Sequence, residues 1–464
     1  MKYENEKVSG LKIAYIGGGS KGWAWALMSD LMQAEDISGT LYLYDIDRKA
    51  AEDNKLIGEK YNEVEGAKSH WSYEVADTLQ TALTDADFVI ISIMPGTYEE
   101  MQSDVHAPEK FGIYQSVGDT VGAGGILRTL RTVPMYEEFA RAIKEYCPSA
   151  WVINYTNPMT LCVKTLYRVF PEIKAFGCCH EVFGTMKFFV KILQKYYGFE
   201  NICREDIKVN VIGINHFTWL TSAKYKNIDL FEVYKKFCEE HPEGMPQNAD
   251  DNWMTLPGKT TERVKMDLFK RYGYIAAAGD RHLAEFCPAT WYLDNLDVVK
   301  NWGYGQTPVS WRVDAILKHR IEESRKFICG EKPLELRPSG EDGVNQIRAL
   351  LGLHEMITNV NLPNVGQIPN LPLGAVVETN AIFRTDEVRP VAAGNIPSCL
   401  YSMIARIVGE QEAIDEAAAE RDLEKAFAVF VTDPQLKISL EDARALFDEM
   451  VENTKEYLQE YLQK

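Results

Sequence analysis

The sequence contains a glycine turn of the kind that binds dinucleotides. Gly17, Gly19 and Gly22 fit the pattern G-x-G-x-x-G between an apolar run and a helix-like segment. Glycines in such a turn allow a tight bend and a close approach of a pyrophosphate, and the helix N-terminus favours anions. Asp45 ends the next apolar run, 23 residues after Gly22, near the spacing of an acid that bonds the adenosine ribose. We therefore expect these residues, together with Ser20, to bind a dinucleotide such as NAD.

The same turn also fits a second motif. Gly18, Ser20 and Gly22 match G-x-S-x-G, the nucleophile elbow of serine hydrolases. An elbow normally follows several earlier strands, whereas this apolar run would be the first strand of the chain. The hydrolase interpretation also leaves Asp45 without a role, so nucleotide binding is favoured.

Two predicted strands end in residues that could bind a divalent cation. Cys178, Cys179 and His180 follow one apolar run, and His216 follows another in GINHF. Thiolate and imidazole are ligands for borderline divalent metals. On these residues alone, a buried cysteine pair and a core histidine are the favoured interpretation.

Amides and guanidinium groups follow other predicted elements. Asn154 and Asn157 lie in the segment NYTNP at a predicted strand end, where they could bind a sugar or a nicotinamide. An Asn-Pro turn is an alternative interpretation of the same segment. Arg128 and Arg131 follow a glycine-rich loop and could bind a carboxylate. Surface arginines without such a role are the alternative.

One short segment carries several ionisable groups. Asp280, Arg281, His282 and Glu285 follow Gly279. A carboxylate near a metal and a cofactor could act as a general base, and an exposed charged turn is the alternative.

Alternating strands and helices must position these residues. Residues 11–200 alternate apolar runs with helix-like segments, which predicts a doubly wound parallel sheet. The run that ends near Pro95 should line the cofactor site, because ligands bind at the carboxyl ends of such strands. We expect a loop through the glycines near 118–125 and then a helix over 133–146.

The pattern changes after residue 200 to long strands and less regular helices. We therefore predict an NAD-binding Rossmann-like domain over residues 10–200. A C-terminal α+β domain over residues 201–464 would supply catalytic, substrate-binding and oligomerisation surfaces. The site should lie between the two domains.

Composition limits the class of protein. The chain has 464 residues, a formal net charge of −18 and nine cysteines without a C-x-x-C motif. The negative charge disfavours nucleic acids and anionic membranes as partners. The cysteine pattern argues against a disulfide framework. No apolar run approaches the roughly 18 residues of a membrane span, and the polar N-terminus does not resemble a signal peptide. A cytoplasmic protein is expected.

Taken together, the motifs resemble glycoside hydrolase family 4. The glycine turn, the Asn-Pro pair, the Cys-His pair and the Asn-His pair occur in the order of that family. The segments VGDTVGAGGI, INYTNPM, GCCHEVFG, GINHFTW and AAGDRHLAEF are most similar to its bacterial alpha-galacturonidase branch. The resemblance implies a lactate/malate dehydrogenase-like fold, NAD, a divalent metal that is usually Mn²⁺, and a homodimer or homotetramer.

The implied reaction is an exception to two-carboxylate glycoside hydrolysis. Hydride leaves carbon-3 of the sugar for NAD, a base removes the carbon-2 proton, and the aglycone leaves by elimination. Water then adds and the hydride returns. An alpha-glucosidase or alpha-galactosidase of the same family, or a simple NAD-dependent dehydrogenase, are the alternatives.

The resemblance also implies roles for single residues. Cys179 and His216 match the metal ligands. His180 matches a proposed proton donor, and Asp280 a proposed proton acceptor. Relatives that act on sugar phosphates use a tyrosine as the base, and Tyr274 is the alternative to Asp280 here.

Substrate contacts follow in the same way. Asn157 matches a substrate-binding asparagine, and Asn154 is a less certain neighbour. Asp119, in the segment VGDTVGAGGI, is a further candidate. A galacturonide also needs a cation near carbon-6. Arg128 or Arg281 is expected to supply it, with Arg131 and His282 as further candidates.

Overall fold

The first sheet has the strand order of a dinucleotide-binding domain. The structure, a computed structural model, describes residues 1–245 and 260–463. Six parallel strands lie in the order β4-β3-β2-β5-β6-β7. Their bounds are β2 (Lys7–Ile16), β3 (Ile37–Tyr44), β4 (Trp71–Val75), β5 (Phe88–Ile91), β6 (Trp151–Asn154) and β7 (Lys174–Gly177). This arrangement confirms the predicted doubly wound sheet and places a ligand crevice between the ends of β2 and β5.

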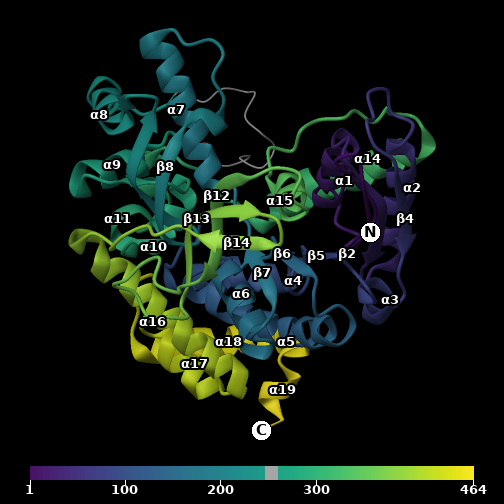
Figure 1. Cartoon of the computed structure of the whole chain (residues 1–464). Coiled ribbons are helices and arrows are strands. Elements are labelled where there is room, and N and C mark those ends of the chain that lie inside the picture. The colour runs from purple at the N-terminus through teal and green to yellow at the C-terminus, as the bar shows by residue number, and fades with distance from the viewer. Residues whose placement is uncertain (246–259, 464) are drawn as a thin grey trace.

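Helices cover both faces of this sheet (Figure 1). Alternate side chains of β2 enter two separate cores: Ile13 and Tyr15 pack in one, and Ala14 and Ile16 in the other. The helices of this part are α1 (Trp23–Gln33), α2 (Arg48–Tyr61), α3 (Leu79–Leu83), α4 (Tyr98–His106), α5 (Gly122–Tyr146), α6 (Met159–Val169) and α7 (Glu181–Tyr197).

Helix α5 begins eleven residues before the predicted start at residue 133. The predicted loop is present at Gly118, but it was wrong for Gly122, Gly124 and Gly125, which lie in the first turn of the helix. Gly124 and Gly125 serve close packing instead of a turn. A Cβ atom on Gly124 would lie 2.6 Å from the carbonyl oxygen of Asp104, and one on Gly125 would meet the backbone of Thr120. Glycine costs a helix about 1 kcal/mol relative to alanine, and tertiary packing overrides that cost here.

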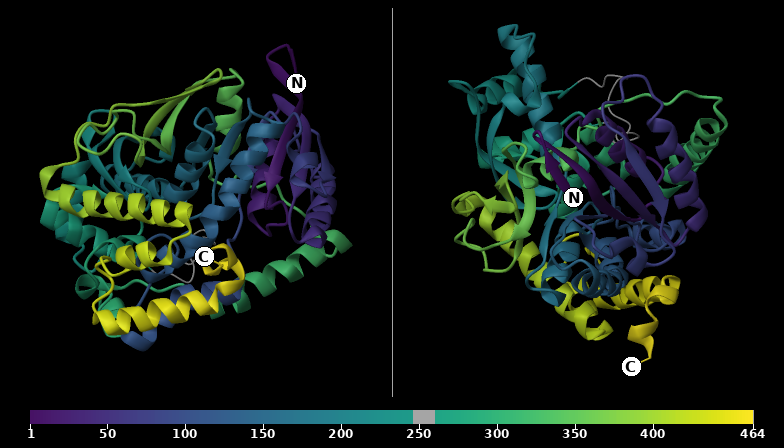
Figure 2. Two further views of the ribbon diagram at one scale, coloured as in Figure 1. Left: turned by 90° about the horizontal axis from the view of Figure 1, so that it is seen from below. Right: turned by 45° about the vertical axis from the view of Figure 1, so that its right-hand side comes forward.

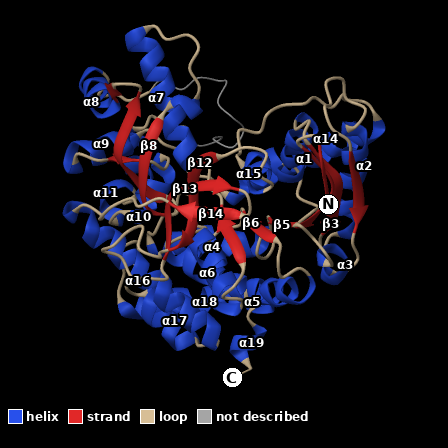
Figure 3. Cartoon of the chain, in the orientation of Figure 1, coloured by secondary structure: helices blue, strands red, loops and turns tan. Residues whose placement is uncertain are grey.

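The later part of the chain completes the first sheet. Strands β12 (Met356–Pro363), β13 (Val376–Arg384) and β14 (Glu387–Pro390) add to β7 in antiparallel order. Figure 3 shows these strands continuing the row that begins with the parallel ones. The division near residue 200 stays a prediction, since backbone hydrogen bonds join segments on both sides of it.

A second, antiparallel sheet is built around a hairpin. Strands β8 (Lys208–Ile214) and β9 (Phe217–Tyr225) pair directly, with Asn215 and His216 as the turn between them. The sheet also holds β10 (Ile228–Asp229) and β11 (Ile275–Ala276), and the helices that follow in the chain are α8 (Leu230–Glu240), α9 (Arg263–Tyr272) and α10 (Asp280–Phe286). The predicted long strands after residue 200 are confirmed.

A helical layer closes the molecule beneath α5 (Figure 2). It contains α16 (Ser398–Glu420), α17 (Leu423–Phe430) and α18 (Leu440–Asn453). The remaining elements are β1 (Lys2–Glu4), α11 (Ala289–Tyr292), α12 (Leu296–Trp302), α13 (Val309–Trp311), α14 (Lys318–Cys329), α15 (Gly343–Leu350) and α19 (Gln459–Leu462). Within the described residues, none of the helices combines the length and the apolar character needed to span a bilayer.

Candidate functional site

The glycine turn lies at the carboxyl end of β2, as its motif predicts. Gly17 has a φ of +93°, and a Cβ atom there would overlap the carbonyl oxygen of Ser92. Asp45 Oδ2 accepts a hydrogen bond of 2.8 Å from the Gly19 N–H. The close approach of the Ser92 backbone at Gly17 and the Asp45 contact at Gly19 give the turn the tight shape that a pyrophosphate-binding turn needs.

Asn54 fixes the shape of this turn and was not found from the sequence. Its amide nitrogen donates to the carbonyl oxygens of Gly18 and Ser20, at 2.8 and 3.1 Å. Its Oδ1 accepts from the indole of Trp25 at 2.8 Å. Asn54 is on α2 and the turn is remote in sequence, so no local pattern could have revealed the contact.

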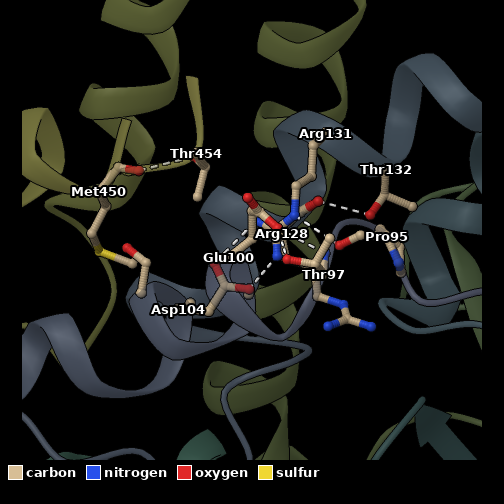
Figure 4. A network of polar contacts seen from close by, with 12 residues as sticks. Pro95, Thr97, Glu100, Asp104, Arg128, Arg131, Thr132, Met450 and Thr454 are labelled. Carbon is tan, nitrogen blue, oxygen red and sulfur yellow. Dashed lines mark hydrogen bonds and ion pairs between the residues drawn. The ribbon is translucent and has the colours of Figure 1, made fainter. Parts of the chain in front are cut away.

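The turn at Pro95 is held by a buried ion pair (Figure 4). Arg131 donates to the Pro95 carbonyl oxygen at 2.9 Å, and its other nitrogens pair with Asp104. Neither side chain of this pair is exposed. Arg131, weighed as a partner for a substrate carboxylate, instead positions the loop at the end of β5.

Asp119, His216 and His282 form a compact cluster of side chains. One ligand atom from each lies within 4.8 Å of the other two, a geometry that could hold a metal ion. The imidazole rings of His216 and His282 stack with centroids 3.7 Å apart. The sequence suggests His282 only as a partner for the substrate carboxylate, whereas the structure places it against His216, a predicted metal ligand.

Hydrogen bonds fix the tautomer of His216. Thr120 Oγ1 donates to Asp119 Oδ1 at 2.7 Å, so this hydroxyl must accept the 3.0 Å bond from His216 Nδ1–H. The lone pair on His216 Nε2 then remains for a cation. His216 also has a φ of +62°, a left-handed conformation in the β8–β9 turn.

The charges of the cluster are strongly coupled. Burial opposes the ionisation of Asp119, but His216, His282 and Arg128 lower the pKa of its carboxyl group to about 2. Burial and the neighbouring His216 lower the pKa of His282 to about 3. At neutral pH the cluster therefore presents a carboxylate and two neutral imidazoles, which are cation ligands.

Cys179, the other predicted metal ligand, is not one of the three residues of this cluster; its side chain interacts with Asn215, the neighbour of His216. Burial, with Glu378 and Glu181 nearby, raises the pKa of its thiol well above the usual value. Asn359 donates to the Cys179 carbonyl oxygen and to Glu378. Asn215 Oδ1 is buried without a hydrogen-bond partner among the described residues. A thiol and an amide oxygen are groups that could bind a divalent cation.

His180 is positioned between two carboxylates. Its Nδ1 lies 3.2 Å from Glu341, and its Nε2 lies 3.9 Å from Glu181. Burial disfavours the charged ring, but Glu341 and Glu181 raise the pKa of His180 overall. Glu181 also lies 3.7 Å from His282 Nε2, so it connects His180 to the histidine cluster.

The two asparagines of NYTNP have different environments. Asn154 accepts from the Tyr136 hydroxyl at 2.5 Å and donates to Thr156 O at 3.0 Å, which makes it part of the buried turn. Asn157 donates to Asp119 at 3.3 Å, while its Oδ1 is buried without a partner among the described residues. Only Asn157 therefore keeps an acceptor for a ligand.

The carboxylates of α10 are both buried. Asp280 accepts from the backbone N–H groups of Val264 and Lys265, and burial raises its pKa to about 7. Glu285 accepts from the N–H groups of Val117 and Gly118 through one oxygen only. Burial raises its pKa to about 8.

Two arginines, Arg128 and Arg312, act on Asp119. Arg128 donates to the Asn157 carbonyl oxygen at 3.0 Å, and its charge acts on Asp119. Arg312 donates a hydrogen bond to Thr307. The charge of Asp119 raises the pKa of Arg312, and the charge of Arg281 lowers it. Arg312 was not found from the sequence, because nothing in WRVDAI marks it as a site residue.

Comparisons with known proteins relate both parts of the chain to one family. Residues 12–195 match the model of family 4 glycosyl hydrolases, and residues 211–436 match the model of their C-terminal domain. An alpha-galacturonidase of Thermoanaerobacterium saccharolyticum is 58% identical over 99% of this chain and 98% of its own. One of Bacillus subtilis is 48% identical over 95% of this chain and 97% of its own.

Solved structures share the fold. The crystal structure of lplD from Bacillus subtilis has a TM-score of 0.90 at 48% identity, covering 95% of this chain and 100% of its own. A 6-phospho-alpha-glucosidase from gut microorganisms, solved with NAD and Mn²⁺, has a TM-score of 0.82 at 22% identity, covering 97% and 99%. The second likeness concerns the fold alone.

Proposed function

Because this chain belongs to the family 4 glycosyl hydrolases, we propose that it is an NAD- and manganese-dependent alpha-galacturonidase. The substrate is an alpha-galacturonide, and cleavage proceeds through a transient oxidation of the sugar. Relatives at 48–58% identity that are named alpha-galacturonidase support this substrate class.

One path of contacts carries the proposal. Trp23 follows the last glycine of the turn, and its ring lies 6.2 Å from that of His180. Glu181 connects His180 to His282, which stacks on His216. Contacts thus link His180 both to the dinucleotide turn and to the group of cation ligands. Oxidation-assisted cleavage needs such an arrangement, whereas simple hydrolysis does not.

The residues fit both absent groups. The glycine turn with Asp45 would hold NAD, and Cys179 with His216 would hold the cation. When bound, NAD supplies a hydride acceptor for carbon-3, and the cation acts as a Lewis acid on the neighbouring sugar oxygens.

The side chains of this chain supply the proton transfers. His180, whose pKa is raised by Glu341 and Glu181, donates a proton to the departing glycosidic oxygen. Asp280 accepts the proton from carbon-2, a role suited to a carboxyl group whose pKa is about 7. Glu285 is the alternative base, since one of its oxygens has no partner among the described residues. Tyr274 lines a separate pocket with Asn395 and Tyr401.

The uronate carboxylate is bound by arginine. Arg128 and Arg312 act on the carboxylate of Asp119, and Arg281 acts on Arg312. Arginine side chains near the site favour an anionic sugar over a neutral galactoside. Arg128 is engaged with Asn157, so Arg281 is the preferred carboxylate ligand.

The proposal is tested with an aryl alpha-galacturonide, with and without NAD, Mn²⁺ and reductant. Aglycone release that needs all three, without net NADH formation, is expected. Net NADH would indicate a dehydrogenase instead. Activity that survives the removal of both NAD and the cation would contradict the proposal.

The carboxylate assignment has its own test. Replacing Arg128 or Arg281 with methionine should reduce turnover of the galacturonide much more than turnover of the neutral galactoside. Arg325→Met, at an exposed ion pair on α14, is the matched control. An unchanged preference in both variants would refute the assignment. The predicted homodimer or homotetramer stays a prediction.

A further inference from the structure

Residues 309–341 form a segment that returns from the second part of the chain to the nucleotide domain. We call it the return segment. It contains α13, a π-helix (Arg312–Leu317) and α14. Figure 1 shows α14 beside α1 and α2.

The return segment is fixed to α1 along much of its length. The ring of Phe327 packs edge-on against Trp25, with centroids 5.6 Å apart. Further along, Ser29 exchanges hydrogen bonds with the backbone of Arg337, and Asp30 accepts from the Ser339 N–H at 2.9 Å. These contacts hold the segment in one position relative to the glycine turn.

This position places Arg320 on the dinucleotide turn itself. Its guanidinium group donates to the carbonyl oxygen of Lys21. A Cβ atom on Gly22 would overlap the same guanidinium group. The third glycine of the motif therefore makes room for a cation that comes from almost 300 residues further along the chain, besides any packing role.

A cation is electrostatically misplaced at this point. Gly22 is the N-cap of α1, no side chain caps the helix, and its first turn contains no acidic residue. The positive end of the helix dipole thus faces a second positive charge. Burial lowers the pKa of Arg320, although Glu323 and Tyr98 oppose this effect. An anion that contacts both the helix end and the guanidinium group would stabilise both.

We propose that Arg320 is a dinucleotide-binding residue whose guanidinium group, beside the N-terminus of α1, binds the pyrophosphate. The inference rests on the proposed function, because that function supplies the dinucleotide. A guanidinium group suits two phosphoryl oxygens through its paired N–H donors. Tyr98, which begins α4 after the Pro95 turn, interacts with Arg320. Arg320 is therefore close both to the turn that follows β2 and to the segment that follows β5.

Binding measurements test the role without relying on turnover. Calorimetry on the purified protein compares NADH, ADP and adenosine for the native chain, Arg320→Met and Arg320→Lys. Arg320→Met should weaken NADH and ADP by about 10- to 100-fold, the range of a charge-assisted hydrogen bond. Adenosine should change less than about twofold, and Arg320→Lys should fall between. Higher salt should weaken ADP binding less in Arg320→Met than in the native chain.

Arg325→Met is the matched control on the same helix. Arg325 is half exposed and pairs with Glu322 and Glu331 on the surface, so its loss should leave all three affinities unchanged. Circular dichroism and thermal melting check the folding of each variant. If Arg320→Met does not fold, the affinities of Arg320→Lys test the proposal instead.

The failures of the two proposals can be told apart. If the native chain binds neither NADH nor ADP, the proposed function fails. If it binds both and Arg320→Met keeps ADP affinity within about twofold, only the role of Arg320 is refuted. Equal weakening of ADP and adenosine would also refute it, because it would indicate that Arg320 only anchors the return segment.

Discussion

Unsatisfied polar atoms mark the site at the scale of single residues. Asn157 Oδ1, Asn215 Oδ1 and His282 Nδ1 are buried without hydrogen-bond partners among the described residues. Leaving a buried polar atom unpaired costs about 1–3 kcal/mol. All three atoms belong to residues around Asp119 and His216, so a ligand that pairs with them recovers this cost. The folded chain is therefore predisposed to bind a polar ligand here.

The adjacent cysteines allow a matched test of the metal site. Cys179 faces Glu378 and Asn215, whereas Cys178 donates to Gln346 Oε1 at 3.1 Å. Cys179→Ala should weaken Mn²⁺ binding at least about tenfold by removing a ligand. Cys178→Ala should leave it unchanged. Titration followed by electron paramagnetic resonance measures both. Equal Mn²⁺ affinity in the two variants would refute Cys179 as a ligand and would favour Asp119, His216 and His282 as the ligands instead.

The first glycine of the turn can be tested in the same way. Gly17→Ala places a methyl group on the Ser92 carbonyl oxygen at a φ of +93°, so it should abolish NADH binding and lower thermal stability. Gly184, exposed in α7 with open space around it, is the control. Gly184→Ala should stabilise the protein by about 0.5–1 kcal/mol. NADH fluorescence and thermal melting measure both effects, and unchanged NADH binding by Gly17→Ala would contradict the assignment.

At the scale of elements, the loop between α17 and α18 in the C-terminal layer positions two helices of the site, α5 and α10. Asp433 accepts from the Gly122 N–H at the start of α5. The Gln435 amide donates to the carbonyl oxygens of Glu285 and Cys287 at the end of α10. One loop thus fixes both the helix behind Asp119 and the helix that carries His282.

Removing the Gln435 amide should disturb this positioning. Gln435→Ala leaves two buried carbonyl groups unpaired, at a cost of about 1–3 kcal/mol. We expect lower stability in urea and a lower kcat with little change in KM, because α10 carries the proposed base, Asp280. Gln194→Ala, at an exposed position of α7, should change neither quantity. A normal kcat in Gln435→Ala would show that α10 is positioned by other contacts.

Elements with strong local signals were predictable from the sequence. Helix α2 (Arg48–Tyr61) has such signals, since Asp47 caps it and its apolar residues recur at helical spacing. The turn with Gly17 and the strand before Asp45 were equally clear. The later part of α5 was predicted, but its first turns were not, because their glycines pack against backbone that only folding brings close. Asn54, Arg312 and Arg320 were missed for the same reason: each acts on residues distant in the chain.

At the scale of the whole molecule, ion pairs join distant layers of a chain whose net charge is −18. Glu137 of α5 is the centre of one group. It accepts from Arg421 at 2.8 Å and from Arg168 at 3.1 Å. These arginines end α16 and lie in α6, so the group connects the nucleotide domain to the C-terminal layer.

This group predicts a specific acid sensitivity. Burial opposes the ionisation of Glu137, but Arg421 and Arg168 outweigh it and lower the pKa of the carboxyl group. A lowered folded-state pKa means that the stabilisation is complete above the unfolded value of about 4.5 and is lost as the pH falls through the folded value. Glu137→Gln should therefore cost about 2 kcal/mol at pH 7 and progressively less below pH 4.5.

Urea unfolding of both proteins across this pH range measures the difference. Glu424→Gln, at an exposed pair with Arg444, is the control and should cost less than about 1 kcal/mol at any pH. A penalty for Glu137→Gln that stays constant down to pH 3 would show that packing, not charge, holds the two layers together. A penalty that vanishes on acidification would instead mean that the junction weakens when Glu137 is protonated, since both arginines would then face each other without a carboxylate between them.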